Sequence, residues 1–134
     1  MRWTHRSYSL LGLLLLAVIE STAPLPAAEP IKVGVIGLDN YQAVAFTHLF
    51  HQAKKGDNLA GLQVVCAVPL HSPDIKESVD SLPRWVEQFE KLEIEIVGSI
   101  DMLLERVDAV LVMSLDGRKH LDQVTPVLKA GKPV

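Results

Sequence analysis

Blocks of apolar and polar residues alternate along most of the chain. Short runs rich in valine, isoleucine and leucine are separated by polar turns and by longer segments in which apolar residues recur every three or four positions. The short runs predict buried strands, because they are too short for typical helices and end at glycine or polar residues. We expect strands at 31–36, 62–68, 95–97 and 108–113, and helices at 43–55, 84–92, 100–106 and 119–130.

The first helical segment shows the clearest amphipathic spacing. Phe46, Leu49, Phe50 and Ala53 share one face, and Ala43 lies near it. This stripe predicts the side of the helix that packs against the sheet.

Boundary signals mark the other segments. Residues 69–83 contain three prolines and are expected to form a polar loop. Ser99 is a predicted N-cap for the helix that follows it, since its hydroxyl can accept from a free backbone amide. Pro126 is expected to interrupt or kink the last helix, and Gly131 to end it.

Strands that alternate with helices indicate an α/β fold, in which a doubly wound parallel sheet carries helices on both faces. The sheet is expected to be incomplete at its C-terminal end, since Pro133-Val134 would begin a further strand. Ligands of such sheets lie beyond the carboxyl ends of the strands. Three candidate loops therefore share one rim: 37–42, 69–83 and 114–118.

The N-terminal segment has the pattern of a secretory signal. Arg2 and Arg6 precede ten uncharged residues at 10–19, and small residues follow up to Ala28. Ten residues span about 15 Å as a helix, roughly half of a bilayer core, which disfavours a stable membrane anchor. We expect residues 1–28 to be a signal peptide and the protein to be exported, to a periplasm or outside the cell. The alternative is an uncleaved N-terminal helix.

Composition narrows the function classes. The chain has 134 residues, of which 49% are hydrophobic, so a wholly disordered protein is excluded. One cysteine cannot form an internal disulfide, and Cys66 inside a strand is expected to be a buried apolar residue. A net charge of −3 offers no electrostatic reason for nucleic-acid binding. His48 and His51 are expected on a solvated helix face rather than at a metal site.

The first strand and its turn approach a dinucleotide-binding fingerprint. The fingerprint needs three glycines between a strand and a helix, for tight turning, close pyrophosphate approach and helix packing. Gly37 matches the first, whereas Asp39 and Gln42 occupy the second and third positions. Taken alone, the motif is equally compatible with a plain turn between strand and helix.

The C-terminal third carries a more specific pattern. The run DAVLVM at 108–113 is followed by a short turn, by His120 and then by PVLKAGKPV up to Val134. The segment SIDMLLER at 99–106 precedes it. Over residues 31–134 the chain resembles the N-terminal Rossmann domain of the Gfo/Idh/MocA oxidoreductases.

This resemblance implies NAD(P)-dependent hydride transfer on a sugar, cyclitol or related polyol. It also implies a C-terminal α/β domain that binds the substrate, and we expect that domain to lie outside this sequence. The family's catalytic lysine, in a Glu-Lys-Pro motif, would follow Val134, and Lys132 belongs to the preceding AGK turn. Residues 29–134 are therefore expected to be a partial, truncated cofactor domain without an assigned catalytic residue. Whether the chain is an enzyme stays open, as does a homo-oligomer of the full-length protein.

The resemblance also implies the residues of a cofactor site. Ser114 and Asp116 are expected near the nicotinamide ribose. His120 lies at the same rim, with hydrogen bonding at a helix start as its alternative role. The predicted NAD or NADP site comprises Gly37, Leu38, Asp39, Asn40, Tyr41, Ser114, Asp116 and His120.

Several departures from the family pattern support a second function. Pro69 stands where an acid after the second strand usually binds the ribose, and Asp74 in the next loop is expected to be a solvated acid. Asp39 places a charge where a phosphate should approach, and Arg118 can pair with a phosphate or with Asp116. The alternative function is a noncatalytic, Rossmann-like binding protein with a degenerate cofactor site.

Overall fold

Four parallel strands form one sheet, in the order β3-β2-β1-β4. The computed structural model describes residues 29–134, and the predicted signal segment lies outside the described residues. The strands are β1 (Ile31–Ile36), β2 (Leu62–Val68), β3 (Glu95–Ile96) and β4 (Ala109–Val112). The helices are α1 (Tyr41–Gln52), α2 (Lys76–Lys91), α3 (Ile100–Leu104) and α4 (His120–Lys129), and a 3-10 turn, η1 (Gly117–Lys119), precedes α4.

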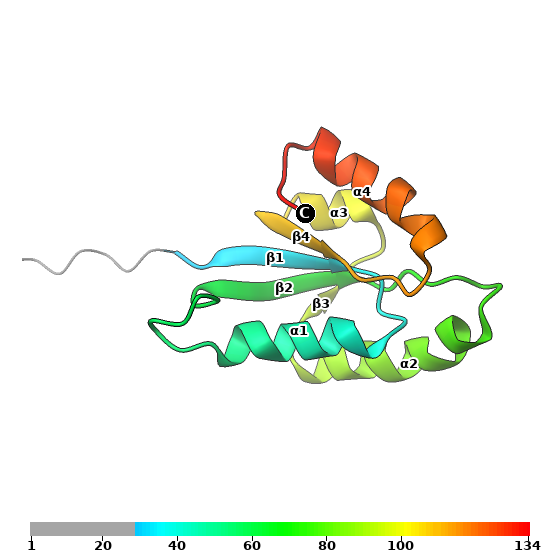
Figure 1. Cartoon of the computed structure of the whole chain (residues 1–134), viewed down its shortest axis with the longest axis horizontal. Helices are drawn as coiled ribbons and strands as arrows, with labels where there is room; N and C mark the ends of the chain where they lie inside the picture. The colour runs from blue at the N-terminus through cyan, green and yellow to red at the C-terminus, as the bar shows by residue number, and fades with distance from the viewer. Residues whose placement is uncertain (1–28) are drawn as a thin grey trace, which may run out of the picture.

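Helices cover both faces of the sheet, as the sequence pattern predicts. Figure 1 shows α1 and α2 on one side, and α3 and α4 on the other. Strand residues alternate between the two sides: Val35 packs in the cluster under α1 and α2, and its neighbour Ile36 packs in the cluster under α3 and α4. The doubly wound α/β fold is thereby confirmed.

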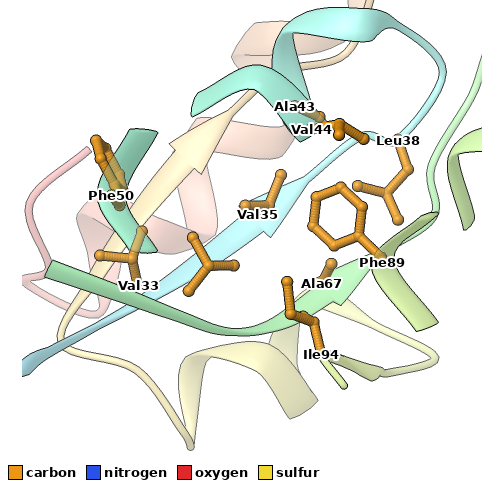
Figure 2. Packing of buried hydrophobic residues seen from close by; sticks show 10 residues of the cluster. Val33, Val35, Leu38, Ala43, Val44, Phe50, Ala67, Phe89 and Ile94 are labelled. Atoms are coloured by element: carbon orange, nitrogen blue, oxygen red, sulfur yellow. The ribbon is translucent and has the colours of Figure 1, made fainter. Parts of the chain in front are cut away.

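The core under α1 and α2 packs aliphatic residues around two phenylalanine rings, Phe50 of α1 and Phe89 of α2. Phe89 of α2 is fully buried, and its ring lies beside Leu38 (Figure 2). The half-buried Trp85 also packs against this cluster, so α2 contributes two of its aromatic side chains and α1 contributes Phe50.

The core under α3 and α4 depends on a glycine in β1. A Cβ atom on Gly34 would lie 2.6 Å from the side chain of Leu103, which is fully buried. The missing side chain therefore lets α3 pack directly against the strand. Cys66 is also fully buried in this cluster, as predicted.

The predicted packing face of α1 is correct at Phe50 and Ala43 but wrong at Phe46 and Leu49. Phe46 and Leu49 are 42% and 49% exposed, and the buried face consists of Ala43, Val44, Thr47 and Phe50. Thr47 is a polar residue, but its hydroxyl donates to the carbonyl of Ala43 at 2.8 Å, within its own helix. With its polar group satisfied, the threonine packs against the sheet as an apolar residue does.

The loop predicted at 69–83 is also too long. Helix α2 begins at Lys76 and continues through Pro83, an exposed position. The sequence signal failed because proline disfavours a helix interior without forbidding it. Helix α4 likewise continues through Pro126, so that proline does not interrupt it.

The remaining boundaries agree closely with the pattern. Ser99 is the N-cap of α3, where its hydroxyl accepts from the amide of Met102 at 3.2 Å. Gly131 follows α4 with a φ of 69°, a left-handed conformation that suits glycine at a helix end. None of the helices within residues 29–134 combines the length and the apolar character needed to span a bilayer.

Candidate functional site

A crevice lies at the point where the strand order reverses. Strand β1 lies between β2 and β4 in the sheet. The chain leaves β1 and β4 toward opposite faces, so the loops that follow these two strands diverge at the carboxyl edge of the sheet. The loops gather at the right-hand end of the sheet in Figure 1. Between them is a hollow of about 250 Å³, lined by Asn40, Gln42, Val112, Met113, Ser114, Leu115 and His120.

The crevice is not the largest hollow of the described part of the chain. One of about 470 Å³ lies on α2, lined by Lys76, Glu77, Asp80 and Ser81. Lys76 and Asp80 there form an exposed ion pair one helical turn apart, which is ordinary for a solvated helix surface. We therefore place the candidate site at the switch point, where parallel sheets bind ligands.

Gly37 brings two walls of the crevice together. Its φ of 89° is a left-handed conformation, and a Cβ atom there would lie 2.2 Å from the Oγ of Ser114 and 2.5 Å from its amide nitrogen. Only glycine permits this conformation together with this approach. The β1–α1 turn and the β4–α4 loop are thus in direct contact beneath the crevice.

Asn40 sets the start of α1 at the crevice wall. Its Oδ1 accepts from the amide of Gln42 at 2.9 Å, which caps the helix, and its side-chain amide donates to the carbonyl of Met113 after β4. The first turn of α1 contains no acidic residue, so no side chain within that turn offsets the positive end of the helix dipole.

Asp39 points away from the crevice and into the protein. Its side chain is only 1% exposed, and it is not among the crevice lining. One carboxylate oxygen accepts from the amide of Leu115 at 2.9 Å, and the other accepts from the hydroxyl of Ser78 on α2. Ser81 donates to the main-chain carbonyl of Asp39 at 2.6 Å. The fingerprint aspartate therefore joins three segments of the rim.

A second buried carboxylate lies on the other side of this rim. Asp116, 5% exposed, accepts from the hydroxyl of Ser72 at 2.7 Å and from Nε of Arg118 at 2.9 Å. The Arg118 guanidinium, and after it the Ser72 hydroxyl, hold the pKa of Asp116 well below its usual range.

Arg118 continues outward to Asp74 in the β2–α2 loop. The two side chains meet at 2.6 Å in an exposed ion pair. The hydrogen bond from Arg118 lowers the pKa of Asp74, and Asp116 followed by Asp74 raises the pKa of Arg118. Asp74 is exposed, as predicted, but it is also ion-paired. The sequence offered a phosphate or Asp116 as the partner of Arg118, and in the structure Arg118 pairs with Asp116.

His120 and Ser114 form the wall at the start of α4. Nε2 of His120 donates to the carbonyl of Ser114 at 2.8 Å, which leaves Nδ1 for another partner. The Ser114 hydroxyl accepts from the side-chain amide of Gln123 at 2.8 Å. Within residues 29–134, Gln123 Oε1 is a buried oxygen without a hydrogen-bond partner. His120 thus makes the predicted helix-start hydrogen bond and also lines the crevice.

The end of β2 lacks the polar group that a ribose requires. Leu70 donates its amide to the carbonyl of Val68 at 2.9 Å, so the chain turns tightly around Pro69. Leu70 then accepts from the amide of Leu38 at 3.4 Å. A proline turn therefore occupies the position where an acid would meet the ribose.

The eight predicted cofactor residues divide into three groups. Asn40, Ser114 and His120 line the crevice, and Gly37 supports its floor. Asp39 and Asp116 are buried in the hydrogen-bond network behind it. The side chain of Leu38 packs in the core, and Tyr41 packs against Trp85 on α2, with ring centroids 6.0 Å apart.

Sequence reasoning missed Ser72 and Ser78 as members of the site. They lie 33 and 39 residues after Asp39, and serine is common in loops and at helix starts. The two serines are also bonded to each other, because the amide of Ser72 donates to the Oγ of Ser78 at 2.8 Å. Only the folded arrangement of the loops brings these hydroxyls to the buried carboxylates.

The two histidines of α1 are exposed, as predicted. His51 also accepts a hydrogen bond, because the amide of Val64 on β2 donates to its Nε2 at 3.1 Å. No cluster of three or more potential metal ligands occurs among residues 29–134.

Comparisons with known proteins bear on the fold. No family profile and no curated protein matches the sequence. Two solved structures are similar: UDP-N-acetylglucosamine 3-dehydrogenase GnnA from Acidithiobacillus ferrooxidans, with a TM-score of 0.54, and a protein described as an NADPH-dependent oxidoreductase from Desulfitobacterium hafniense DCB-2, with a TM-score of 0.56. Each match has 18% sequence identity and covers 78% of this chain.

The chain spans about a quarter of the length of these structures, 28% of the first and 26% of the second. At this identity the likeness establishes the fold alone. The described part of the chain has a Rossmann-like α/β fold, which is the fold that the resemblance in its sequence implies.

Proposed function

We propose that residues 29–134 bind NAD or NADP as the cofactor domain of an exported oxidoreductase. The observation that carries the proposal is the crevice at the switch point, with the uncharged first turn of α1 on one wall and Ser114 and His120 on the other. The free amides of a helix start suit the pyrophosphate, and the polar groups on the opposite wall suit a ribose.

The residues present fit part of a dinucleotide. Asp39 does not oppose the pyrophosphate directly, because its carboxylate is buried and bonded to Leu115 and Ser78. The volume of about 250 Å³ is somewhat below the range of roughly 300–1,000 Å³ typical of ligand pockets, so the crevice fits the nicotinamide side better than a whole dinucleotide. When bound, the cofactor would supply hydride transfer, whereas this chain's residues would bind and orient it.

The remaining elements of the proposal rest on the family resemblance. The substrate would be a sugar, cyclitol or related polyol held by a separate domain. Export would follow from the signal pattern at 1–28. On this proposal the partner is a small molecule and not a nucleic acid, and the protein has no stable membrane anchor.

A noncatalytic binding protein is the second candidate. The proline turn at Pro69 favours it, because a proline stands where the usual ribose-binding acid would be. This candidate predicts a Rossmann-like fold without saturable affinity for either cofactor.

Calorimetric titration of the mature full-length protein with NAD and NADP separates the two candidates. The informative variant is Gln42→Glu, which adds a negative charge to the crevice wall in the first turn of α1. We expect at least about tenfold weaker binding from repulsion of the phosphates, since one close charge pair in a partly exposed site reaches about 4 kcal/mol. An acid at this position also stabilises the helix by about 0.3–1 kcal/mol, so weaker binding would not reflect unfolding.

Gln52→Glu is the matched control. It makes the same chemical change at the opposite end of α1 and is expected to leave the affinity unchanged. No saturable signal for the unmodified protein at millimolar cofactor would refute cofactor binding and support the noncatalytic candidate. Equal weakening by both variants would place the ligand elsewhere.

A further inference from the structure

Side chains from two loops meet across the rim above β1. The β2–α2 loop contributes Ser72 and Asp74, and the β4–α4 loop contributes Asp116 and Arg118. We call these four residues the strap. Its inner tie joins the Ser72 hydroxyl to Asp116 at 2.7 Å, and its outer tie joins Arg118 to Asp74 at 2.6 Å.

The strap is continuous with the buried bonds of Asp39. Ser78 donates to the Asp39 carboxylate and accepts from the amide of Ser72 at 2.8 Å. Leu115, next to Asp116, donates to the same carboxylate at 2.9 Å. The two loops are therefore linked directly through the strap and indirectly through Asp39.

From the sheet topology, we expect the strap to cross the path that a dinucleotide takes. In a doubly wound sheet, the pyrophosphate lies at the start of the first helix, and one nucleoside lies beyond the end of the second strand. The other nucleoside lies on the far side of the switch point, here beside β4. A dinucleotide must therefore pass over β1 from the β2 side to the β4 side, where the two loops are bonded to each other.

We propose that the strap is a gate: the β2–α2 and β4–α4 loops open together, and a pyridine dinucleotide enters only when the Ser72–Asp116 and Arg118–Asp74 ties are broken. This inference rests on the proposed function, because it names what regulates access to that crevice. It makes Ser72 and Arg118 positioning residues, which act by holding loops and not by touching reacting atoms.

The two ties differ in how easily they break. Arg118 and Asp74 are 62% and 57% exposed, so water and salt compete for their pairing, and such pairs contribute little. Ser72 is buried, and its hydroxyl makes one hydrogen bond to a carboxylate that Arg118 also holds. Loss of the serine hydroxyl leaves Asp116 paired with Arg118, so Ser72→Ala should remove the inner tie without unfolding the loop.

Hydrogen exchange and stopped-flow binding on the mature full-length protein test the gate. Ser72→Ala is expected to speed amide exchange about tenfold in both 70–75 and 114–118, because one hydrogen bond to a charged group is lost. The association rate of NADPH, followed by quenching of tryptophan fluorescence, should rise several-fold. Asp74→Asn should raise both rates less in high salt than in low salt, since it removes the screened outer tie and leaves Arg118 bonded to Asp116.

Ser99→Ala is the matched control, because it also removes one serine hydroxyl bond, at the start of α3. It should change neither loop exchange nor the association rate. Faster exchange in 70–75 alone, or an unchanged NADPH association rate in Ser72→Ala, would overturn the gate. If no variant binds either cofactor, the proposed function fails, and the gate for a dinucleotide fails with it. In that case the exchange data still decide whether the two loops open together.

Discussion

Gly37 and Asp39 are two positions apart, and each has a different physical role at the rim. Gly37 is needed for space, since Ser114 occupies the volume of any side chain at that position. Asp39 is needed for its acceptors, since it satisfies a backbone amide and a serine hydroxyl in a buried region. In the glycine fingerprint, both positions allow a ligand to approach the backbone. In this chain, both positions make contacts between loops.

Replacing Gly37 by alanine should destabilise the fold strongly. A left-handed backbone costs a non-glycine residue about 1–2 kcal/mol, and forcing a methyl group into packed structure costs about 1–3 kcal/mol more. The free energy of unfolding, measured by urea denaturation, should therefore fall by about 2–5 kcal/mol.

Gly61→Ala is the control for this substitution. Gly61 has the same φ of 89°, but nothing lies within 4 Å of its added Cβ. Its loss should be limited to the backbone cost of about 1–2 kcal/mol. Equal losses in the two variants would mean that Ser114 yields to the added methyl group without cost.

Among the elements, α2 departs furthest from local preference. Its N-cap, Ile75, makes no side-chain capping bond, and Pro83 interrupts its hydrogen-bond ladder. Tertiary contacts offset both defects, because Phe89 is fully buried and Ser78 is bonded to Asp39. The helix is thus held mainly by its packing face and by the site at its start.

Pro83→Ala should stabilise the protein. The exposed alanine restores a backbone amide that can donate to the carbonyl of Val79, and it removes a ring that crowds the helix interior. We expect a gain of up to about 3 kcal/mol in the free energy of unfolding, with increased helical signal in circular dichroism.

Pro73→Ala is the control, and it should lower the free energy of unfolding where Pro83→Ala raises it. Pro73 is exposed in the β2–α2 loop, where its loss mainly increases the freedom of the unfolded chain. Its stability should fall by up to about 1 kcal/mol. A loss of stability in Pro83→Ala would show that the proline itself contributes to the packing of α2.

For the whole molecule, the distribution of charge matters more than the net charge of −3. Two carboxylates at the rim are buried, one with a cation and one with neutral donors. Elsewhere among residues 29–134, some exposed charged groups form pairs, such as Lys91 with Glu87, and this pairing lowers the pKa of that glutamate. The acid sensitivity of the fold should therefore originate at the rim.

Stability should decline as the pH falls below about 5. The pKa of Asp116 is lower in the folded protein than in the unfolded chain, where it is about 3.9. The unfolded state therefore takes up its proton first, so the stabilisation is present at neutral pH and is lost as the pH falls through this range.

Asp116→Asn tests the origin of this decline. The variant should be less stable at pH 7, and its unfolding free energy should fall less between pH 5 and pH 2, as followed by urea denaturation. Asp122→Asn, at an exposed position on α4, should keep the slope of the unmodified protein. Parallel curves for Asp116→Asn and the unmodified protein would contradict the assignment.

The sequence by itself determined the order and type of most elements. Apolar runs at β1, β2 and β4 are strong signals, because strands buried on both faces need a continuous apolar sequence. Their alternation with helices also determined the parallel sheet and the three loops that share one rim. The crevice residues Asn40, Ser114 and His120 follow from that topology and from the family resemblance.

Tertiary structure decided which side chains pack, which ones pair and how far α2 extends. Thr47 is buried in place of Phe46 because its hydroxyl is satisfied within the helix. The carboxylates of Asp39 and Asp116 turn inward because Ser78, Leu115, Ser72 and Arg118 meet them there. These partners lie far apart along the chain or follow no periodic pattern, so a hydrogen bond between loops leaves no local signal in the sequence. The rim is formed only when the sheet brings the ends of its strands together.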